Sequence, residues 1–144
     1  MNNTVFQIKA LLSYDDFILY ASDITKHLVD NYPDFHRWFF KVASELPSPD
    51  RKVYVSIIED KVVVIVIFKR GDENKLCTLY IDEKYQGYGI GSAFMRLVKD
   101  YYADEAFNLT IAEKTYLSCK DFFIKNGFFI NRVFNGENMP DIFN

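Results

Sequence analysis

The chain has 144 residues, of which 49% are hydrophobic and 17% aromatic, and its formal net charge at pH 7 is −3. A chain of this length is expected to form a single domain over residues 1–144, with enough apolar side chains for a core. The slightly acidic balance argues against a nucleic-acid partner, because no face rich in Lys and Arg stands out to neutralise phosphates. No apolar run approaches the ~20 residues of a membrane-spanning helix, and no signal peptide is apparent, so we expect a soluble, cytoplasmic protein without a membrane partner.

The two cysteines, Cys77 and Cys119, fall inside predicted elements and lack the spacing of a metal-ligand pair. In a reducing cytosol, buried free thiols are the simplest interpretation. The sequence therefore predicts no metal site.

The first third of the chain predicts one short strand and two helices. Val5–Ala10 alternates in the manner of a half-buried strand. Ser13 and Asp16 resemble a capping box at the start of a helix, whose apolar stripe continues until Pro33 breaks it. Asp34–Ala43 predicts a second helix that buries aromatic side chains.

The middle of the chain predicts a hairpin, a further strand and a helix. Arg51–Ile58 and Lys61–Lys69 are separated by only two residues and predict an antiparallel hairpin. Lys75–Ile81 predicts the next strand, and an amphipathic helix runs to about Tyr102. The turn between that strand and the helix contains three glycines at alternate positions: Gly87, Gly89 and Gly91.

The last third predicts a strand, a helix and a hairpin. Phe107–Ala112 alternates and predicts a strand. Thr115 can cap the last helix, which Gly127 ends in a left-handed conformation. Phe128–Phe134 predicts a long strand, and Asn135-Gly136 predicts a hairpin turn back toward Ile142-Phe143.

The glycine turn is the most informative feature of the sequence. A strand that turns through glycines into a helix leaves the first helical N–H groups unpaired and directed at one point, with the positive end of the helix dipole behind them. Glycine lets a phosphate approach the backbone closely. The turn therefore predicts a site for a phosphorylated small molecule.

The spacing of residues in this turn distinguishes three kinds of phosphate-binding loop. The nucleotide P-loop needs a Gly-Lys pair, which the sequence lacks. The dinucleotide pattern G-x-G-x-x-G, started at Gly87, needs Gly or Ala at the position of Ser92. The pattern [Gln/Arg]-x-x-Gly-x-[Gly/Ala] is met in full by Gln86, Gly89 and Gly91. This pattern resembles the pyrophosphate loop of the GNAT superfamily, the acetyl-CoA-dependent N-acyltransferases.

The resemblance extends over the whole chain, since the predicted order β-α-α-β-β-β-α-β-α-β-β matches the order of the family. It implies a single-domain α/β (α+β) GNAT fold. The implied central sheet is mixed, has about six to seven strands and splays between the fourth and fifth, with helices on both faces.

The resemblance also implies acetyl-CoA as the cofactor and assigns residues to it. The pyrophosphate is expected on the loop, which comprises Gln86, Gly87, Tyr88, Gly89, Ile90, Gly91 and Ser92. The motif offset places the backbone that binds the pantetheine arm at Leu79, Tyr80 and Ile81. A backbone N–H in that stretch would polarise the thioester carbonyl. Phe123, on the last helix, is expected to face the cofactor arm.

The residues for proton transfer depart from the family pattern. Family members often carry a tyrosine as general acid four residues before the Gly-Phe that ends the last helix, and Phe123 occupies that position. The Asn at the start of this helix in the family is replaced by Tyr116, which is a candidate acid with packing as the alternative. A Glu early in the fourth strand is replaced by Lys75. Glu113 is then the best remaining carboxylate, although solvated surface is its alternative.

The implied activity is transfer of an acetyl group from acetyl-CoA to an amine that attacks the thioester directly. The acceptor, a small-molecule or protein amine, is not identified by the sequence, and we expect a monomer or homodimer. The first alternative is a GNAT-like module that binds CoA or acyl-CoA without catalysis, which would suit Phe123. A further alternative is a nucleotide-dependent enzyme that uses the same glycine turn.

Overall fold

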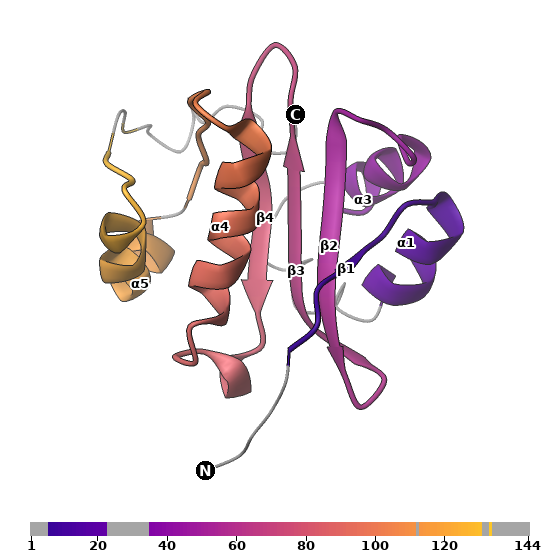
Figure 1. Cartoon of the computed structure of the whole chain (residues 1–144), viewed down its shortest axis with the longest axis horizontal. Coiled ribbons are helices and arrows are strands. Elements are labelled where there is room, and N and C mark those ends of the chain that lie inside the picture. The colour runs from indigo at the N-terminus through magenta and orange to yellow at the C-terminus, as the bar shows by residue number, and fades with distance from the viewer. Residues whose placement is uncertain (1–5, 23–34, 112, 131–132, 134–144) are drawn as a thin grey trace.

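The computed structural model describes residues 6–22, 35–111, 113–130 and 133 (Figure 1). The strands in these ranges are β1 (Lys9–Ala10), β2 (Arg51–Ile58), β3 (Lys61–Lys69) and β4 (Lys75–Ile81). The helices are α1 (Tyr14–Ala21), α3 (Phe35–Ser44), α4 (Ile90–Tyr102) and α5 (Glu113–Lys125), with a short 3-10 helix, η3 (Glu83–Tyr85). None of the helices in the described ranges is long and apolar enough to cross a membrane.

The sheet is antiparallel and has the order β1-β2-β3-β4. The predicted hairpin of β2 and β3 is confirmed with its bounds. Glu59 and Asp60, which join the two strands, have φ angles of 52° and 64°, and two positive φ angles give the turn that matches strand twist. Strand β3 lies in the middle of the sheet, and residues 62–68 within it are all buried.

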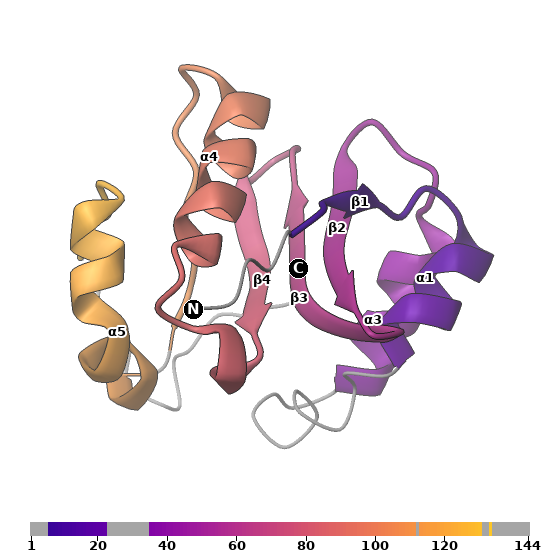
Figure 2. The same cartoon turned by 60° about the horizontal axis from the view of Figure 1, so that its bottom comes forward.

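Helices cover both faces of this sheet, as expected (Figure 2). On one face, α1 and α3 pack on Ile65 and Ile67, and on the other α4 packs on Val64 and Val66. The predicted cap of α1 is confirmed, because the Ser13 side chain accepts a hydrogen bond of 3.1 Å from the Asp16 N–H. Figures 1 and 2 both show α5 beside α4, away from the other helices.

The predicted sheet of six to seven strands is not found in the described ranges, where four strands form. Phe107–Ala112, predicted as a strand, contributes one parallel bridge, between Asn108 and Lys75. The Phe107 ring stacks on Tyr102 of α4, with 4.7 Å between the ring centroids. The apolar side chain that contributed to the strand prediction is therefore packed against α4. Residues 128–130 and 133, from the predicted last strand, are not in a strand either.

Several further predictions differ from the structure or fall outside the described residues. The first strand was predicted over Val5–Ala10, and of its described residues, 6–10, only Lys9–Ala10 form a strand, β1. The predicted continuation of the first helix toward Pro33, the end of the last strand, toward Phe134, and the hairpin return after it lie outside the described residues. The predicted helix Asp34–Ala43 agrees with α3 to within one residue at each end.

Candidate cofactor site

The loop between β4 and α4 is tied to the end of β4 by two side chains. Asp82 accepts a hydrogen bond of 2.9 Å from the Lys84 N–H and so caps η3. The Gln86 side-chain amide donates to the Ile81 carbonyl at 2.9 Å. The first residue of the predicted motif therefore fixes the loop against the strand that precedes it.

The glycines of this loop present open backbone. Gly87 and Gly89 have φ angles of 89° and 80°, a conformation that L-residues with a side chain rarely adopt. A Cβ at either position would meet no protein atom within 4 Å. The space in front of both residues is therefore free for a ligand.

The start of α4 lacks a side-chain cap. Gly89 is the N-cap residue, and its carbonyl accepts the first helical hydrogen bond, of 3.1 Å, from the Ala93 N–H. The N–H groups of Ile90, Gly91 and Ser92 consequently have no intrahelical acceptor. They converge at the positive end of the α4 dipole, which is the arrangement that binds phosphate. Tyr88 lies beside them with its side chain 68% exposed.

Among the described residues, no strand pairs with the outer edge of β4 next to this loop. The Asp82 N–H donates to the Val63 carbonyl at 2.8 Å. Because successive residues of a strand point to opposite edges, the backbone of Tyr80 also faces β3, whereas that of Leu79 and Ile81 faces outward. In the described part of the chain, the one bridge on this outer edge is at Lys75, near the start of β4. The Ile81 carbonyl already accepts a bond from Gln86, so the N–H groups of Leu79 and Ile81 and the Leu79 carbonyl are the groups placed to pair with an extended ligand.

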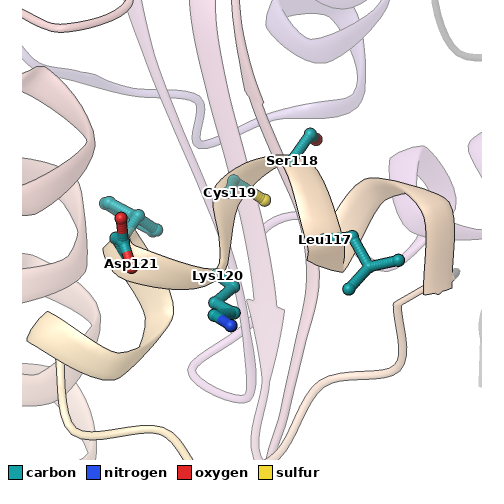
Figure 3. A pocket seen from close by; sticks show the side chains of 6 residues that line it. Leu117, Ser118, Cys119, Lys120 and Asp121 are labelled. Atoms are coloured by element: carbon teal, nitrogen blue, oxygen red, sulfur yellow. The ribbon is translucent and has the colours of Figure 1, made fainter.

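Helix α5 approaches the loop through Phe122, which sequence reasoning did not single out. The Phe122 ring and the Ile81 side chain both lie close to Gly91. The helix is broken at Cys119, whose φ and ψ angles are −133° and 24°. A cavity of about 350 Å³ lies at this break, and Figure 3 shows the residues around it. Residues 117–122 line this cavity.

The two predicted catalytic candidates, Tyr116 and Glu113, and the predicted cofactor neighbour Phe123 all lie on α5. Tyr116 and Phe123 are brought together, with near-parallel rings 6.3 Å apart. Phe123 is 8% exposed, and its edge-to-face contact with Phe128 has a centroid distance of 5.7 Å. Glu113 is the first residue of α5, and its side chain lies outside the described residues.

The two thiols are held in different ways. Cys77, on β4, lies 3.3 Å from a guanidinium nitrogen of Arg51. Burial raises the pKa of the Cys77 thiol, and the positive charge of Arg51 opposes this rise only in part. Burial also raises the pKa of Cys119 at the break in α5. Both cysteines are free, as predicted.

Comparison with known proteins places this loop and sheet in a family. A sequence model of the acetyltransferase (GNAT) domain matches residues 49–129, more than half of the chain. A search of curated protein sequences finds no match. Many solved structures share the fold. The sequence identities of those described below are so low that the likeness shows the fold alone.

Three of these structures illustrate the likeness. A predicted acetyltransferase with acetyl-CoA from Clostridium acetobutylicum has a TM-score of 0.70 at 11% identity, over 91% of this chain and 94% of that one. The PaiA N-acetyltransferase of Thermoplasma acidophilum, in complex with coenzyme A, has a TM-score of 0.60 at 15% identity, over 92% and 95%. An aminoglycoside acetyltransferase from an uncultured soil metagenomic sample, in complex with sisomicin, has a TM-score of 0.64 at 18% identity, over 90% and 93%. With the family match over residues 49–129, the chain belongs to the acetyltransferase (GNAT) family.

Proposed function

We propose that this protein is an N-acetyltransferase that transfers the acetyl group of acetyl-CoA to an amine. The observation that carries the proposal is the uncapped start of α4, behind Gly87 and Gly89, next to the outer edge of β4. The first feature suits the pyrophosphate of CoA. The second suits the two amides of its pantetheine arm, which can pair with the backbone of Leu79 and Ile81 as an added strand would.

The proposed reaction needs little side-chain chemistry beyond this backbone. The neutral amine attacks the thioester carbonyl, and an outward N–H of β4 stabilises the oxyanion that forms. The tetrahedral intermediate then collapses, the carbon–sulfur bond breaks and CoA leaves as a thiolate. Holding the amine and thioester in attack geometry can by itself supply ~7 kcal/mol or more of the required rate enhancement.

The proposed reaction also needs two proton transfers. The amine must lose a proton before or during attack, and the thiolate must gain one. Tyr116 and Glu113 are the candidate groups, and Phe123 is proposed as an apolar neighbour of the cofactor arm. Water can relay both protons if neither side chain does.

A second candidate function is binding of CoA or acyl-CoA without catalysis. Phe123 favours it, because the position that often holds the general acid in the family carries a buried ring without a proton to donate. The two candidates share the cofactor site and differ only in turnover.

Two measurements separate these possibilities. Thermal unfolding with CoA, acetyl-CoA or pantetheine tests the cofactor site, since a ligand of the folded state raises stability by RT ln(1 + [L]/Kd). We expect CoA and acetyl-CoA to raise the melting temperature and pantetheine, which lacks the pyrophosphate, to do so far less. Equal shifts from CoA and pantetheine would exclude the proposed loop site, and a shift from ATP or NAD alone would favour a nucleotide-dependent enzyme.

Turnover is then measured as release of the CoA thiol from acetyl-CoA with a panel of amines. The names of proteins with a similar fold supply three classes of acceptor: aminoglycosides, glucosamine and the alanine of a ribosomal protein. Acceleration of thiol release by an amine supports the transferase. Tight CoA binding with no turnover for any amine class supports the binding module.

A further inference from the structure

Gly91 has a structural requirement that its helical position does not explain. It is the second residue of α4 and is buried, and its φ angle is not in the left-handed region. Alanine would be the better helix former at such a position. The reason for glycine must therefore lie in what surrounds it.

The surroundings of Gly91 differ from those of the other two loop glycines. A Cβ at Gly91 would lie 2.9 Å from Cε1 of Phe122 and 3.0 Å from Cδ1 of Ile81. The contact with Phe122 is shorter than real Cβ atoms essentially ever show, and the contact with Ile81 is among the tightest that occur, so a side chain would have to move. The missing side chain leaves a notch on α4, and the Phe122 ring fills it.

Phe122 is thereby placed beside both parts of the cofactor site. Gly91 belongs to the first turn of α4, where the proposed pyrophosphate site lies. The Ile81 side chain also lies close to Gly91, and Ile81 ends β4, whose outer edge is proposed to pair with the pantetheine arm. The Phe122 ring reaches Gly91 from α5, and the two residues are 31 positions apart in the sequence.

The local structure of α5 fixes the direction of this ring. The break at Cys119 separates the segment that carries Phe122 from the first part of the helix (Figure 3). The end of that segment is held by bonds from the Gly127 N–H to the Ile124 carbonyl (3.0 Å) and from the Phe128 N–H to the Phe123 carbonyl (2.9 Å). This pair of bonds is a Schellman motif. The Phe122 ring is also in edge-to-face contact with Phe123, at 5.3 Å between centroids.

We propose that Phe122 is a positioning residue for the cofactor, and that Gly91 is glycine in order to receive it. The ring sets the separation between α5 and the loop, and with it the distance of α5 from the outer edge of β4 at Leu79 and Ile81. This inference rests on the proposed function, because it assigns the ring a role in binding CoA. It predicts that the two residues are coupled, although neither is expected to bond to the reacting atoms.

The test measures CoA affinity by calorimetry, well below each melting temperature, for Gly91→Ala, Phe122→Leu and the double variant. We expect Gly91→Ala to bind CoA about tenfold more weakly, because the added methyl displaces the ring. Phe122→Leu should bind about threefold more weakly, since it keeps an apolar contact without the ring edge. The double variant should recover most of the loss of Gly91→Ala, because leucine makes room for the methyl group.

Matched controls exist for both changes. Gly71→Ala adds the same methyl where no atom lies within 4 Å and φ is not left-handed. Phe129→Leu makes the same replacement at a ring that is 82% exposed. Both controls should bind CoA as the parent does, and melting curves of all variants will show whether each is folded.

The outcomes separate this inference from the proposed function. If the parent binds CoA and Gly91→Ala binds it equally well, the notch has no role in the cofactor site and the inference is overturned. A double variant no tighter than Gly91→Ala would also overturn it, because the two residues would then act independently. If Gly91→Ala does not fold, Phe122→Leu compared with Phe129→Leu decides: equal affinities reject the positioning role. A parent that does not bind CoA overturns the inference together with the proposed function.

Discussion

Replacement of Gly89 by valine is the sharpest test of the proposed pyrophosphate site. Gly89 has a φ angle of 80° and a ψ angle of 5°, so any side chain there is strained. A Cβ at Gly89 would nevertheless meet no protein atom within 4 Å. In the protein without ligand, the substitution therefore acts through backbone strain alone. With CoA bound, the same side chain would occupy the space that the pyrophosphate needs.

The structure supplies a control with the same strain at another place. Gly127, at the end of α5, has a φ angle of 87°, and the nearest atom to its Cβ position is Lys99 Nζ at 4.0 Å. Left-handed backbone costs L-residues about 1–2 kcal/mol. At ~2–4 °C per kcal/mol for chains near this size, we expect Gly89→Val and Gly127→Val to lower the melting temperature by similar amounts, about 2–8 °C.

The two variants should differ in their affinity for CoA although their melting temperatures are similar. We expect Gly89→Val to weaken CoA binding by tenfold or more, which corresponds to ~1.4 kcal/mol, and Gly127→Val to weaken it by less than about threefold. Calorimetric titration of folded protein measures both. If the two variants lose affinity equally, strain rather than obstruction is responsible, and the pyrophosphate site lies elsewhere.

Three further predictions address the side chains around the site. Gln86→Leu removes the donor to the Ile81 carbonyl and should weaken CoA binding by about three- to tenfold, the equivalent of one hydrogen bond. Gln86→Arg keeps a donor and should bind CoA as the parent does, so equal losses of affinity in both variants would reject the role of this bond. Tyr116→Phe should lower kcat by less than about threefold, because the ring packs on Phe123 and its hydroxyl is not needed for that contact; a loss of ~100-fold with unchanged CoA affinity would instead identify a general acid. Urea unfolding should show that the contribution of Cys77 to the free energy of unfolding is constant below about pH 9 and falls above it, because the unfolded thiol ionises near its ordinary pKa of 9.0 while burial raises the pKa of the folded thiol. Burial also raises the pKa of Cys119, so Cys77→Ala should reduce the fall in stability above about pH 9 without abolishing it; an unchanged slope would show that other groups cause the fall.

Local signals in the sequence predicted the elements whose formation depends on neighbouring residues. The Ser13 cap and the β2–β3 hairpin are of this kind, since each is decided within a few residues. The start of α4 was also predictable, because glycine readily adopts the left-handed conformation, with a φ angle of 80°, in which Gly89 leads into the helix. The [Gln/Arg]-x-x-Gly-x-[Gly/Ala] spacing placed the loop residues together, and in the structure Gln86 closes that loop on Ile81.

Non-local packing accounts for what the sequence did not predict. Alternation in Phe107–Ala112 shows which side chains are buried, but burial on α4 and burial in a fifth strand give the same pattern. The Phe107 ring stacks on Tyr102, and one bridge at Asn108 is what remains of the expected ladder. The contact of Phe122 with Gly91 joins residues 31 positions apart. In the sequence, the one sign of this contact is a glycine inside a predicted helix, at a position where the helix itself does not require glycine.

The position of Phe123 indicates which groups, side chain or backbone, would bind the proposed cofactor. Tyr116 and Phe128 pack against its ring, and Phe122 next to it contacts the loop, so this part of α5 serves as an aromatic support. The polar groups directed at the proposed cofactor are then mainly backbone N–H groups, those of Leu79 and Ile81 on β4 and those of the first turn of α4. Backbone groups cannot be removed by a side-chain substitution, but their positions depend on glycines and on packing. Substitutions at the glycines and at Phe122 should therefore affect cofactor binding more than the loss of any one hydroxyl or carboxyl group on α5.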